Sequence, residues 1–267
     1  MNTSDVPDFL KDHHVGRVRR AVAFVATHGW RAVWQRARAR GLLGSARFIV
    51  GNIRFLNAVR INRRFDRRYG VDTCGNIPAR YLQVVGDHQP HGSDFLSIPA
   101  RTFERAINLV AEDIRGLTFV DIGAGKGRAM LLAARRPFAR VMGVEYGVEL
   151  AAVANQNFAR YRDPAQRCHD LHCYCADATA FELPPGPLLL YFMRTFDNVM
   201  LTKMIRHIRA SHDARPRRMV ILFVCPPQYA PPADLFLRAG FRHRLTRKLP
   251  FDWAAADPFQ AAIYEVG

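Results

Sequence analysis

Five strand-like runs, separated by helix-like stretches, constrain the fold of this chain most strongly. The fourth run reads PLLLYFM and is apolar throughout, as expected for a strand that is covered on both faces of a sheet. Regular alternation of strand and helix implies right-handed crossovers and a mostly parallel sheet with helices on both sides. The runs lie at 117–122, 140–146, 171–176, 187–193 and 219–225.

Helical periodicity fills the intervals between these runs, and two further runs close the chain. Pro99 suits a first helical turn and Gly116 a helix end. The final runs, 241–249 and 260–266, have no helix between them, so we expect them to form an antiparallel pair at the sheet edge. The fold class is therefore a doubly wound, seven-stranded, mostly parallel α/β sheet. We expect its helices at 99–116, 126–136, 148–161, 198–211 and 233–239.

The N-terminal quarter of the chain differs from the rest in charge. Residues 1–70 hold 15 Lys and Arg against 4 Asp and Glu, whereas residues 71–267 hold 24 against 19. Helical periods run over 15–43 and 47–64, and YGVDTCGNIP then reads as a loop. We place a boundary near Tyr69, between a basic helical segment at 1–70 and a main domain at 71–267.

The basic N-terminal helices are open to three interpretations. Arginines opposite an apolar stripe can meet anionic lipid, meet nucleic acid, or form a solvated face. No nucleic-acid motif with interleaved aromatic residues is present. We favour a lid or a substrate-recognition role, with an acidic partner or a membrane surface as the second choice. The arginines concerned are Arg17, Arg20, Arg31, Arg36 and Arg38.

Composition indicates a globular cytoplasmic protein. No apolar run approaches the roughly 18 residues needed to span a bilayer, and the polar start, MNTSDVPDFLKDHH, is unlike a secretory signal. The five cysteines form no stapling pattern, so we expect reduced thiols.

The segment FVDIGAGKGR joins the first apolar run to a helix through a glycine-rich turn. Gly123, Gly125 and Gly127 allow positive φ and close approach of a ligand to the backbone. The dinucleotide fingerprint requires Gly-x-Gly-x-x-Gly, but position 128 is Arg. Asp121 would repel a pyrophosphate and would suit a ligand that carries an ammonium group. The loop therefore favours a smaller cofactor than a dinucleotide.

Acidic residues end the next two strand-like runs. Glu145 lies where a carboxylate can accept hydrogen bonds from both hydroxyls of a ribose. CADATAF places Asp177 and Ala178 where the edge of an adenine would lie. Together with the glycine loop, these residues form a set that is more specific than the loop alone.

FVDIGAGKGR, GVEYGVELA and CADATAF resemble the first three motifs of class I S-adenosylmethionine-dependent methyltransferases. The GAGKGR loop, with YGVDT upstream and VCPP after the fifth strand, is similar to a group of small bacterial methyltransferases distantly like lysine methyltransferases. The resemblance implies S-adenosylmethionine as cofactor. It also implies cofactor contacts: Asp121, Gly123, Ala124 and Gly125 near the methionine, Glu145 at the ribose, and Asp177 with Ala178 at the adenine. Tyr146, which follows Glu145, is a further expected cofactor contact.

The resemblance implies a methyltransferase, whose task is to align a nucleophile with an activated methyl group and exclude water. In the RTFDN segment, Phe196 is placed to stack on ligand or substrate. Asp197 suits a base, an orienting group or a helix N-cap. Arg194 stands where the similar bacterial group has the asparagine of Asn-Pro-Phe. Arginine cannot accept a hydrogen bond from an amine but binds carboxylate or phosphate well.

We therefore expect an unidentified acceptor, an anionic small molecule methylated on oxygen or on a site near the anion. The alternative for Arg194 is an ion pair with Asp197 away from substrate. The alternative functions are protein lysine N-methylation, a non-catalytic S-adenosylmethionine-binding scaffold and, against the glycine spacing, a nicotinamide-dependent dehydrogenase.

CHDLHCYC has a metal-like composition, but its spacing fits no standard zinc pattern, so we expect no metal. The Cys and His residues of this segment are Cys168, His169, His172, Cys173 and Cys175.

Lys126 suits either an ion pair with a carboxylate at the helix start or a solvated position.

Overall fold

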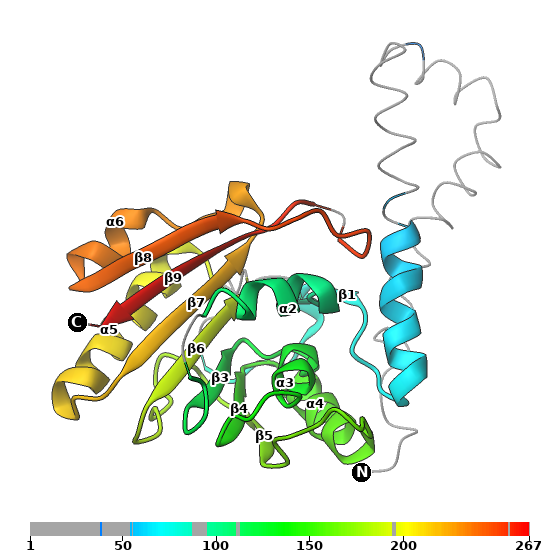
Figure 1. Cartoon of the computed structure of the whole chain (residues 1–267), viewed down its shortest axis with the longest axis horizontal. Coiled ribbons are helices and arrows are strands. Elements are labelled where there is room, and N and C mark those ends of the chain that lie inside the picture. Colours follow the sequence, from blue (N-terminus) through cyan, green and yellow to red (C-terminus); the bar gives the residue numbers. More distant parts are fainter. Residues whose placement is uncertain are drawn as a thin grey trace.

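The computed structural model describes residues 38, 54, 56–86, 95–110, 113–193, 196–255 and 257–266. Its main body is one seven-stranded sheet (Figure 1). Each strand coincides with a predicted run to within one residue at either end. The strands are β3 (Thr118–Ile122), β4 (Arg140–Glu145), β5 (Leu171–Cys175), β6 (Leu188–Met193), β7 (Met219–Cys225), β8 (Phe241–Lys248) and β9 (Gln260–Val266).

The strand order across this sheet is β5-β4-β3-β6-β7-β9-β8. Strands β3 to β7 pair in parallel, whereas β9 runs antiparallel to both β7 and β8. The predicted fold class is confirmed, since the sheet has seven strands, is mostly parallel and ends in an antiparallel pair. From β3 the chain first winds outward through β4 and β5 and then returns to β6 on the other side. Ligands bind at such a switch point in open α/β sheets.

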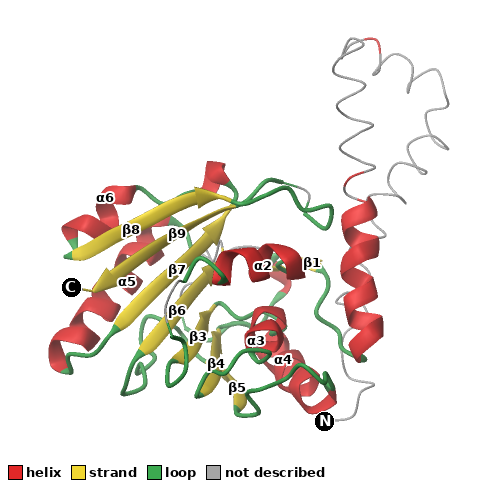
Figure 2. Ribbon diagram, viewed as in Figure 1, coloured by secondary structure: helices red, strands yellow, loops and turns green. Residues whose placement is uncertain are grey.

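Helices cover both faces of the sheet (Figure 2). On one face the core includes side chains of α2 (Ala100–Ile107), α3 (Arg128–Ala133) and α4 (Val148–Arg160). On the other face it includes α5 (Asn198–Ala214) and α6 (Ala233–Arg238). Strand β7 is buried at every position, because both of its faces meet helices.

The helix expected at 99–116 is shorter in the structure. Helix α2 ends at Ile107, and Pro99 is its N-cap rather than part of its first turn. The N–H groups of Leu109 and Val110 bond to carbonyls three residues back, which tightens the chain into turns and closes the helix.

The first expected N-terminal helix lies outside the described residues apart from Arg38. The second is described at 56–69, so it continues five residues beyond the expected end at Arg64. Phe65 and Tyr69 extend its inward apolar face, and Gly70 follows in a left-handed conformation at φ 65°. Within the described ranges, no helix combines the length and the apolar character that crossing a membrane requires.

Short elements lie between this helix and α2 and after β7. The predicted loop at 69–78 contains β1 (Asn76–Ile77), which pairs antiparallel with β2 (Phe95–Leu96). Two single-turn helices complete the described elements, η2 (Ala79–Tyr81) and η4 (Pro227–Tyr229). Strand β2 supplies part of the wall of the pocket described next, through Phe95 and Leu96.

Candidate functional site

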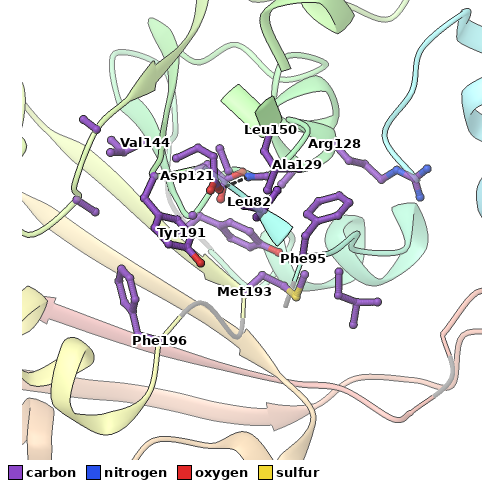
Figure 3. A pocket seen from close by; sticks show the side chains of 18 of the residues that line it. Leu82, Phe95, Asp121, Arg128, Ala129, Val144, Leu150, Tyr191, Met193 and Phe196 are labelled. Carbon is purple, nitrogen blue, oxygen red and sulfur yellow. Dashed lines mark hydrogen bonds between the residues drawn. The ribbon is translucent and has the colours of Figure 1, made fainter. Parts of the chain in front are cut away.

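A pocket opens at the carboxyl ends of β3, β4 and β6 and beside the end of β5 (Figure 3). The space among its lining residues is about 960 Å³ when the open solvent at its mouth is included. The fold thus brings three separate sequence segments to one cavity. All eight residues expected to contact a cofactor line it: Asp121, Gly123, Ala124, Gly125, Glu145, Tyr146, Asp177 and Ala178.

The chain at 82–86 forms a pocket wall that sequence reasoning missed. The N–H of Val85 donates to the carbonyl of Tyr146 at 2.9 Å, and the N–H of Val148 donates to the carbonyl of Gln83 at 2.9 Å. This segment therefore runs beside the turn that follows β4. Its sequence, LQVVG, carries a weak strand-like signal, an apolar pair before a glycine.

The backbone amides of the glycine loop face β4 rather than the pocket. The N–H groups of Gly123 and Ala124 donate to the carbonyl of Val144 at 2.8 and 3.2 Å. The next N–H, that of Gly125, donates to the Glu145 carboxylate at 2.7 Å. A phosphate site needs such amides to be open to the ligand. The loop therefore offers little to a pyrophosphate.

Two glycines of this loop are required by geometry. Gly125 has φ 56°, and a Cβ there would collide with the Phe95 ring. Gly127 has φ 81°, and a Cβ there would lie 2.7 Å from Phe158. Because Gly127 is left-handed, α3 begins at Arg128 instead of the predicted 126. The helix also ends earlier than predicted, at 133 instead of 136.

Glu145 is buried, and each of its carboxylate oxygens already accepts one hydrogen bond. Oε2 accepts from the N–H of Gly125 at 2.7 Å and Oε1 from the N–H of Gly147 at 2.8 Å. Burial raises the pKa of Glu145, and the backbone N–H groups of Gly147, Gly125 and Tyr146 partly offset that rise. A carboxylate can accept about four hydrogen bonds, so Glu145 retains capacity for a further donor from a ligand.

Asp121 and Tyr191 lie side by side on the pocket floor, as paired residues of β3 and β6. Burial, with a further contribution from Glu145, raises the pKa of Asp121 well above its usual range. Burial and the nearby Asp121 likewise raise the pKa of Tyr191. The Tyr191 hydroxyl is buried and has no hydrogen-bond partner among the described residues. Such a group costs about 1–3 kcal/mol unless a ligand satisfies it.

Asp177 is held in a turn that follows the end of strand β5. Its Oδ1 accepts from the N–H of Thr179 at 2.8 Å and from the Thr179 hydroxyl at 2.9 Å. A Cβ at Gly86 would lie 3.5 Å from Oδ2 of Asp177, so the wall segment passes directly beside this acid. The turn fixes the position of Asp177 and of the buried Ala178 at the pocket edge.

The pocket is anionic. Among its described lining residues, Asp121, Glu145 and Asp177 are acidic and Arg128 alone is cationic. The Arg128 side chain points away from the pocket floor (Figure 3), and its guanidinium contacts Asp66 at 2.9 Å. This charge distribution suits a ligand that carries a cationic group.

Lys126 is buried rather than solvated, so its interpretation as an ion-pair partner is correct. Its Nζ lies 2.9 Å from both carboxylate oxygens of Asp72 and donates to the carbonyl of Cys74 at 3.1 Å. The amide of Asn157 also binds here, donating to the carbonyls of Asp72 at 2.7 Å and of Lys126 at 3.0 Å. These bonds hold the YGVDT loop against the glycine loop.

The three residues expected to act in catalysis have different outcomes. Arg194 lies outside the described residues. Phe196 lines the pocket. Asp197 is the N-cap of α5 and accepts from the N–H of Met200 at 2.9 Å. The N-cap interpretation of Asp197 therefore holds in the structure.

The CHDLHCYC segment packs without gathering into a metal site. Cys173 is buried in the core, and burial raises the pKa of its thiol well above the usual range. Among the residues that the structure describes, no three His, Cys, Asp or Glu side chains come together as metal ligands would.

No protein-family model matches this chain, and no curated protein matches it either. The solved structures similar to it include magnesium protoporphyrin IX methyltransferase from Synechocystis PCC 6803 with bound SAM. That pair shares 17% identity over 63% of this chain and 79% of that chain, at a TM-score of 0.48. A TehB-like SAM-dependent methyltransferase from Corynebacterium glutamicum shares 18% identity over 63% of this chain and 88% of that chain, at a TM-score of 0.41. The cyclase SpnF shares 14% identity over 62% of this chain and 80% of that chain, at a TM-score of 0.46. At these values the similarities do not bear on which ligand or acceptor this chain takes.

Proposed function

We propose that this chain is an S-adenosylmethionine-dependent methyltransferase. The observation that carries the proposal is the anionic pocket, whose acids end three adjacent strands and whose loop amides are already bonded. S-adenosylmethionine has an ammonium, a sulfonium and a ribose with two hydroxyls, and it has no phosphate. A nicotinamide dinucleotide would instead bring its pyrophosphate toward Asp121 and Glu145.

The residues present fit this cofactor. Asp121 would accept from the ammonium and Glu145 from the ribose hydroxyls, using the oxygen lone pairs that Gly125 and Gly147 leave open. Tyr146 would lie beside the ribose and Asp177 with Ala178 beside the adenine. The backbone at 123–125 would pass along the methionine. When bound, S-adenosylmethionine supplies a methyl group already activated by the sulfonium.

The protein's remaining task is to place a nucleophile and keep water out. Apolar side chains at the β6 end of the pocket, Met193 and Phe196, would provide a dry surface there. Leu96 adds to it from the opposite wall. Because Asp197 caps α5, we assign it the role of fixing that helix rather than of moving a proton.

The acceptor we propose is an anionic small molecule methylated on oxygen. The support for it is chemical, since Arg194 offers five donors and no acceptor and follows Met193 at the pocket end. A protein lysine amine is the alternative acceptor.

Two measurements test the function. Mass spectrometry of ligand that co-purifies with the protein, followed by calorimetry with S-adenosylmethionine and NAD, should show binding of the first alone. Labelled methyl groups should then transfer into an acceptor fraction of cell extract. Tighter binding of NAD would overturn the proposal. Cofactor binding without transfer to any fraction would leave the non-catalytic scaffold in its place.

A further inference from the structure

Five arginines form the outward face of the helix at 56–69. They recur three, four, seven and eight positions after the first, the spacing that places residues on one side of a helix. All five are exposed. In Figure 1 this helix stands beside the sheet, at the end of the molecule opposite α6. We call these residues the arginine face: Arg60, Arg63, Arg64, Arg67 and Arg68.

The arginine face has no acidic counterpart among the described residues of its own helix. Asp66 is the acid of this helix, and it turns the other way, toward Arg128 and Thr73. In the part of the chain that the structure describes, no member of the arginine face forms an ion pair, whereas Arg135 and Arg136 each pair with an acid.

The fold itself does not require this charge in the middle of the helix. Arg67 and Arg68 lie in the last turn, where cations stabilise the helix dipole. Arg60, Arg63 and Arg64 lie before that turn, where this effect has faded. The helix dipole therefore does not account for these three arginines.

The geometry disfavours a bilayer as that partner. A helix that lies on a membrane presents apolar side chains on the same side that it inserts. Here the apolar side chains Ala58, Phe65 and Tyr69 face inward, where Phe65 and Tyr69 lie near Arg135 and Tyr161. Among the described residues of this helix, Leu56 alone is an exposed large apolar side chain.

A row of phosphates fits the arginine face better. The eight-residue step from Arg60 to Arg68 covers about 12 Å at about 1.5 Å per residue, a span that several successive phosphates of a nucleic acid strand can occupy. The guanidinium fork also matches the geometry of phosphate oxygens.

Two exposed aromatic rings lie beside the beginning of this helix. Phe251 is 44% and Trp253 58% exposed, and their ring centroids are 5.0 Å apart. The guanidinium of Arg54 lies 4.7 Å from the Phe251 ring centroid. Asn62 anchors this loop by donating to the carbonyl of Ala254 at 2.9 Å. Exposed aromatic rings with a guanidinium beside them, as Arg54 is here, are surfaces on which single-stranded bases stack.

We propose that the arginine face and the Phe251–Trp253 pair bind a single-stranded nucleic acid, the arginines its phosphates and the rings its bases. This surface is separate from the anionic pocket. Its binding is measured without S-adenosylmethionine, so its failure would leave the proposed methyl transfer intact, and the reverse also holds.

Fluorescence anisotropy of the full-length chain with a labelled 20-nucleotide single-stranded RNA tests the proposal across a salt series. A triple variant, Arg60→Gln with Arg63→Gln and Arg67→Gln, should weaken binding at least tenfold at low salt. It should also make the slope of log affinity against log salt shallower by about 2, since each lost contact contributes about 0.7. A variant with lysine at the same three positions keeps the positive charges, so it should keep most of the dependence of affinity on salt concentration. Trp253→Ala should weaken binding about tenfold without changing the slope.

A matched control removes the same charge away from this surface, through glutamine at Arg206 on α5, Arg215 at the end of α5 and Arg238 on α6, all of which are exposed. It should change affinity less than twofold. Equal weakening by both triple variants would show attraction by net charge alone and overturn the proposal. Arginine-dependent binding to vesicles with 30% anionic lipid, or to polyglutamate, in preference to the RNA would overturn it in favour of a membrane or an acidic protein.

Discussion

The side chain of Glu145, at the end of β4, accepts a hydrogen bond of 2.7 Å from the backbone N–H of Gly125, in the loop after β3. Its second oxygen accepts from Gly147 at 2.8 Å, in the turn after β4. One buried carboxylate thus joins the two turns that border the pocket. It is also the group that we expect to meet the ribose, so a change there should affect both loop and ligand.

Glu145→Gln should weaken S-adenosylmethionine binding tenfold or more and lower the melting temperature. The new amide NH₂ would face a backbone N–H instead of accepting from it, and charge-assisted bonds to two hydroxyls would be lost, each worth about 1.5–3 kcal/mol. Calorimetry measures the first effect and thermal unfolding the second. Glu182→Gln is the control, because that side chain is 82% exposed. Unchanged affinity in Glu145→Gln would refute the ribose assignment.

Asp121→Asn should stabilise the ligand-free protein while weakening cofactor binding. Burial and Glu145 raise the pKa of Asp121, so the folded state holds this proton more tightly than the unfolded state. The ionised form therefore costs stability as pH rises from the ordinary aspartate range toward the raised pKa. Asparagine removes that cost, and the gain in melting temperature over the wild type should grow with pH.

The raised pKa of Asp121 also predicts how cofactor binding depends on pH. A ligand ammonium favours the ionised form of Asp121, so wild-type affinity should increase with pH and binding should release a proton. Calorimetry in buffers of different ionisation enthalpy measures that release. Asp121→Asn should lose the pH dependence and bind at least tenfold more weakly. Identical pH profiles in both proteins would remove Asp121 from the ammonium site.

Tyr191→Phe should leave the ligand-free protein as stable as the wild type or more so, since it removes a buried hydroxyl that lacks a partner. If that hydroxyl meets cofactor or acceptor, kcat/KM should fall about tenfold. Tyr174→Phe is a matched control on β5, where the hydroxyl accepts from Arg140 instead. A Tyr191→Phe enzyme with wild-type kinetics would place this hydroxyl outside the reaction.

The strands and the acidic residues of the pocket were predictable because they depend on local patterns, whereas the pocket wall at 82–86 was not. Apolar runs fixed the strands, and parallel strands bring their carboxyl ends to one edge, which placed Asp121, Glu145 and Asp177 together. Helix ends were less predictable. They depend on single backbone conformations, such as the left-handed Gly127 that delays α3.

The polar network behind the glycine loop was not predictable from spacing. Asp66 and Asp72 lie some 60 positions before the cations that they bind, Arg128 and Lys126. No periodicity connects residues so far apart, and the fold alone decides which acid meets which base. Tyr191 is a similar case, because a tyrosine within an apolar run looks like any core aromatic until its hydroxyl is found without a partner.

Arg194→Lys and Arg194→Ala should both raise KM for an anionic acceptor sharply and leave cofactor affinity unchanged. Lysine keeps the charge but lacks the planar fork that grips a carboxylate or phosphate. Steady-state kinetics with the identified acceptor, alongside calorimetry with S-adenosylmethionine, separates the two effects. An acceptor that proves to be a lysine amine with no anion nearby would rule out this role.

The ion pair between Asp66 and Arg128 predicts where the chain can be shortened. Their side chains are 12% and 3% exposed and lie 2.9 Å apart, and Asp66 also accepts from the N–H groups of Thr73 and Cys74. A chain that starts at residue 71 would lose Asp66 together with the helix at 56–69, so it should fold poorly.

A chain that starts at residue 54 keeps this network and should bind S-adenosylmethionine like the full-length chain. If residues 1–53 act as a lid, that shorter chain should bind the cofactor but lose methyl transfer.

Asp66→Asn isolates the ion pair from the rest of the helix. It leaves a nearly buried guanidinium without its counter-charge, and breaking such a pair from one side costs about 3–5 kcal/mol. Urea unfolding of the full-length variant measures the loss. Asp213→Asn, which breaks the exposed pair with Arg209 on α5, is the control and should have no measurable effect because solvent screens that pair. If both variants unfold at the wild-type urea concentration, the Asp66–Arg128 pair does not hold the helix to the glycine loop. The chain that starts at residue 71 should then remain folded.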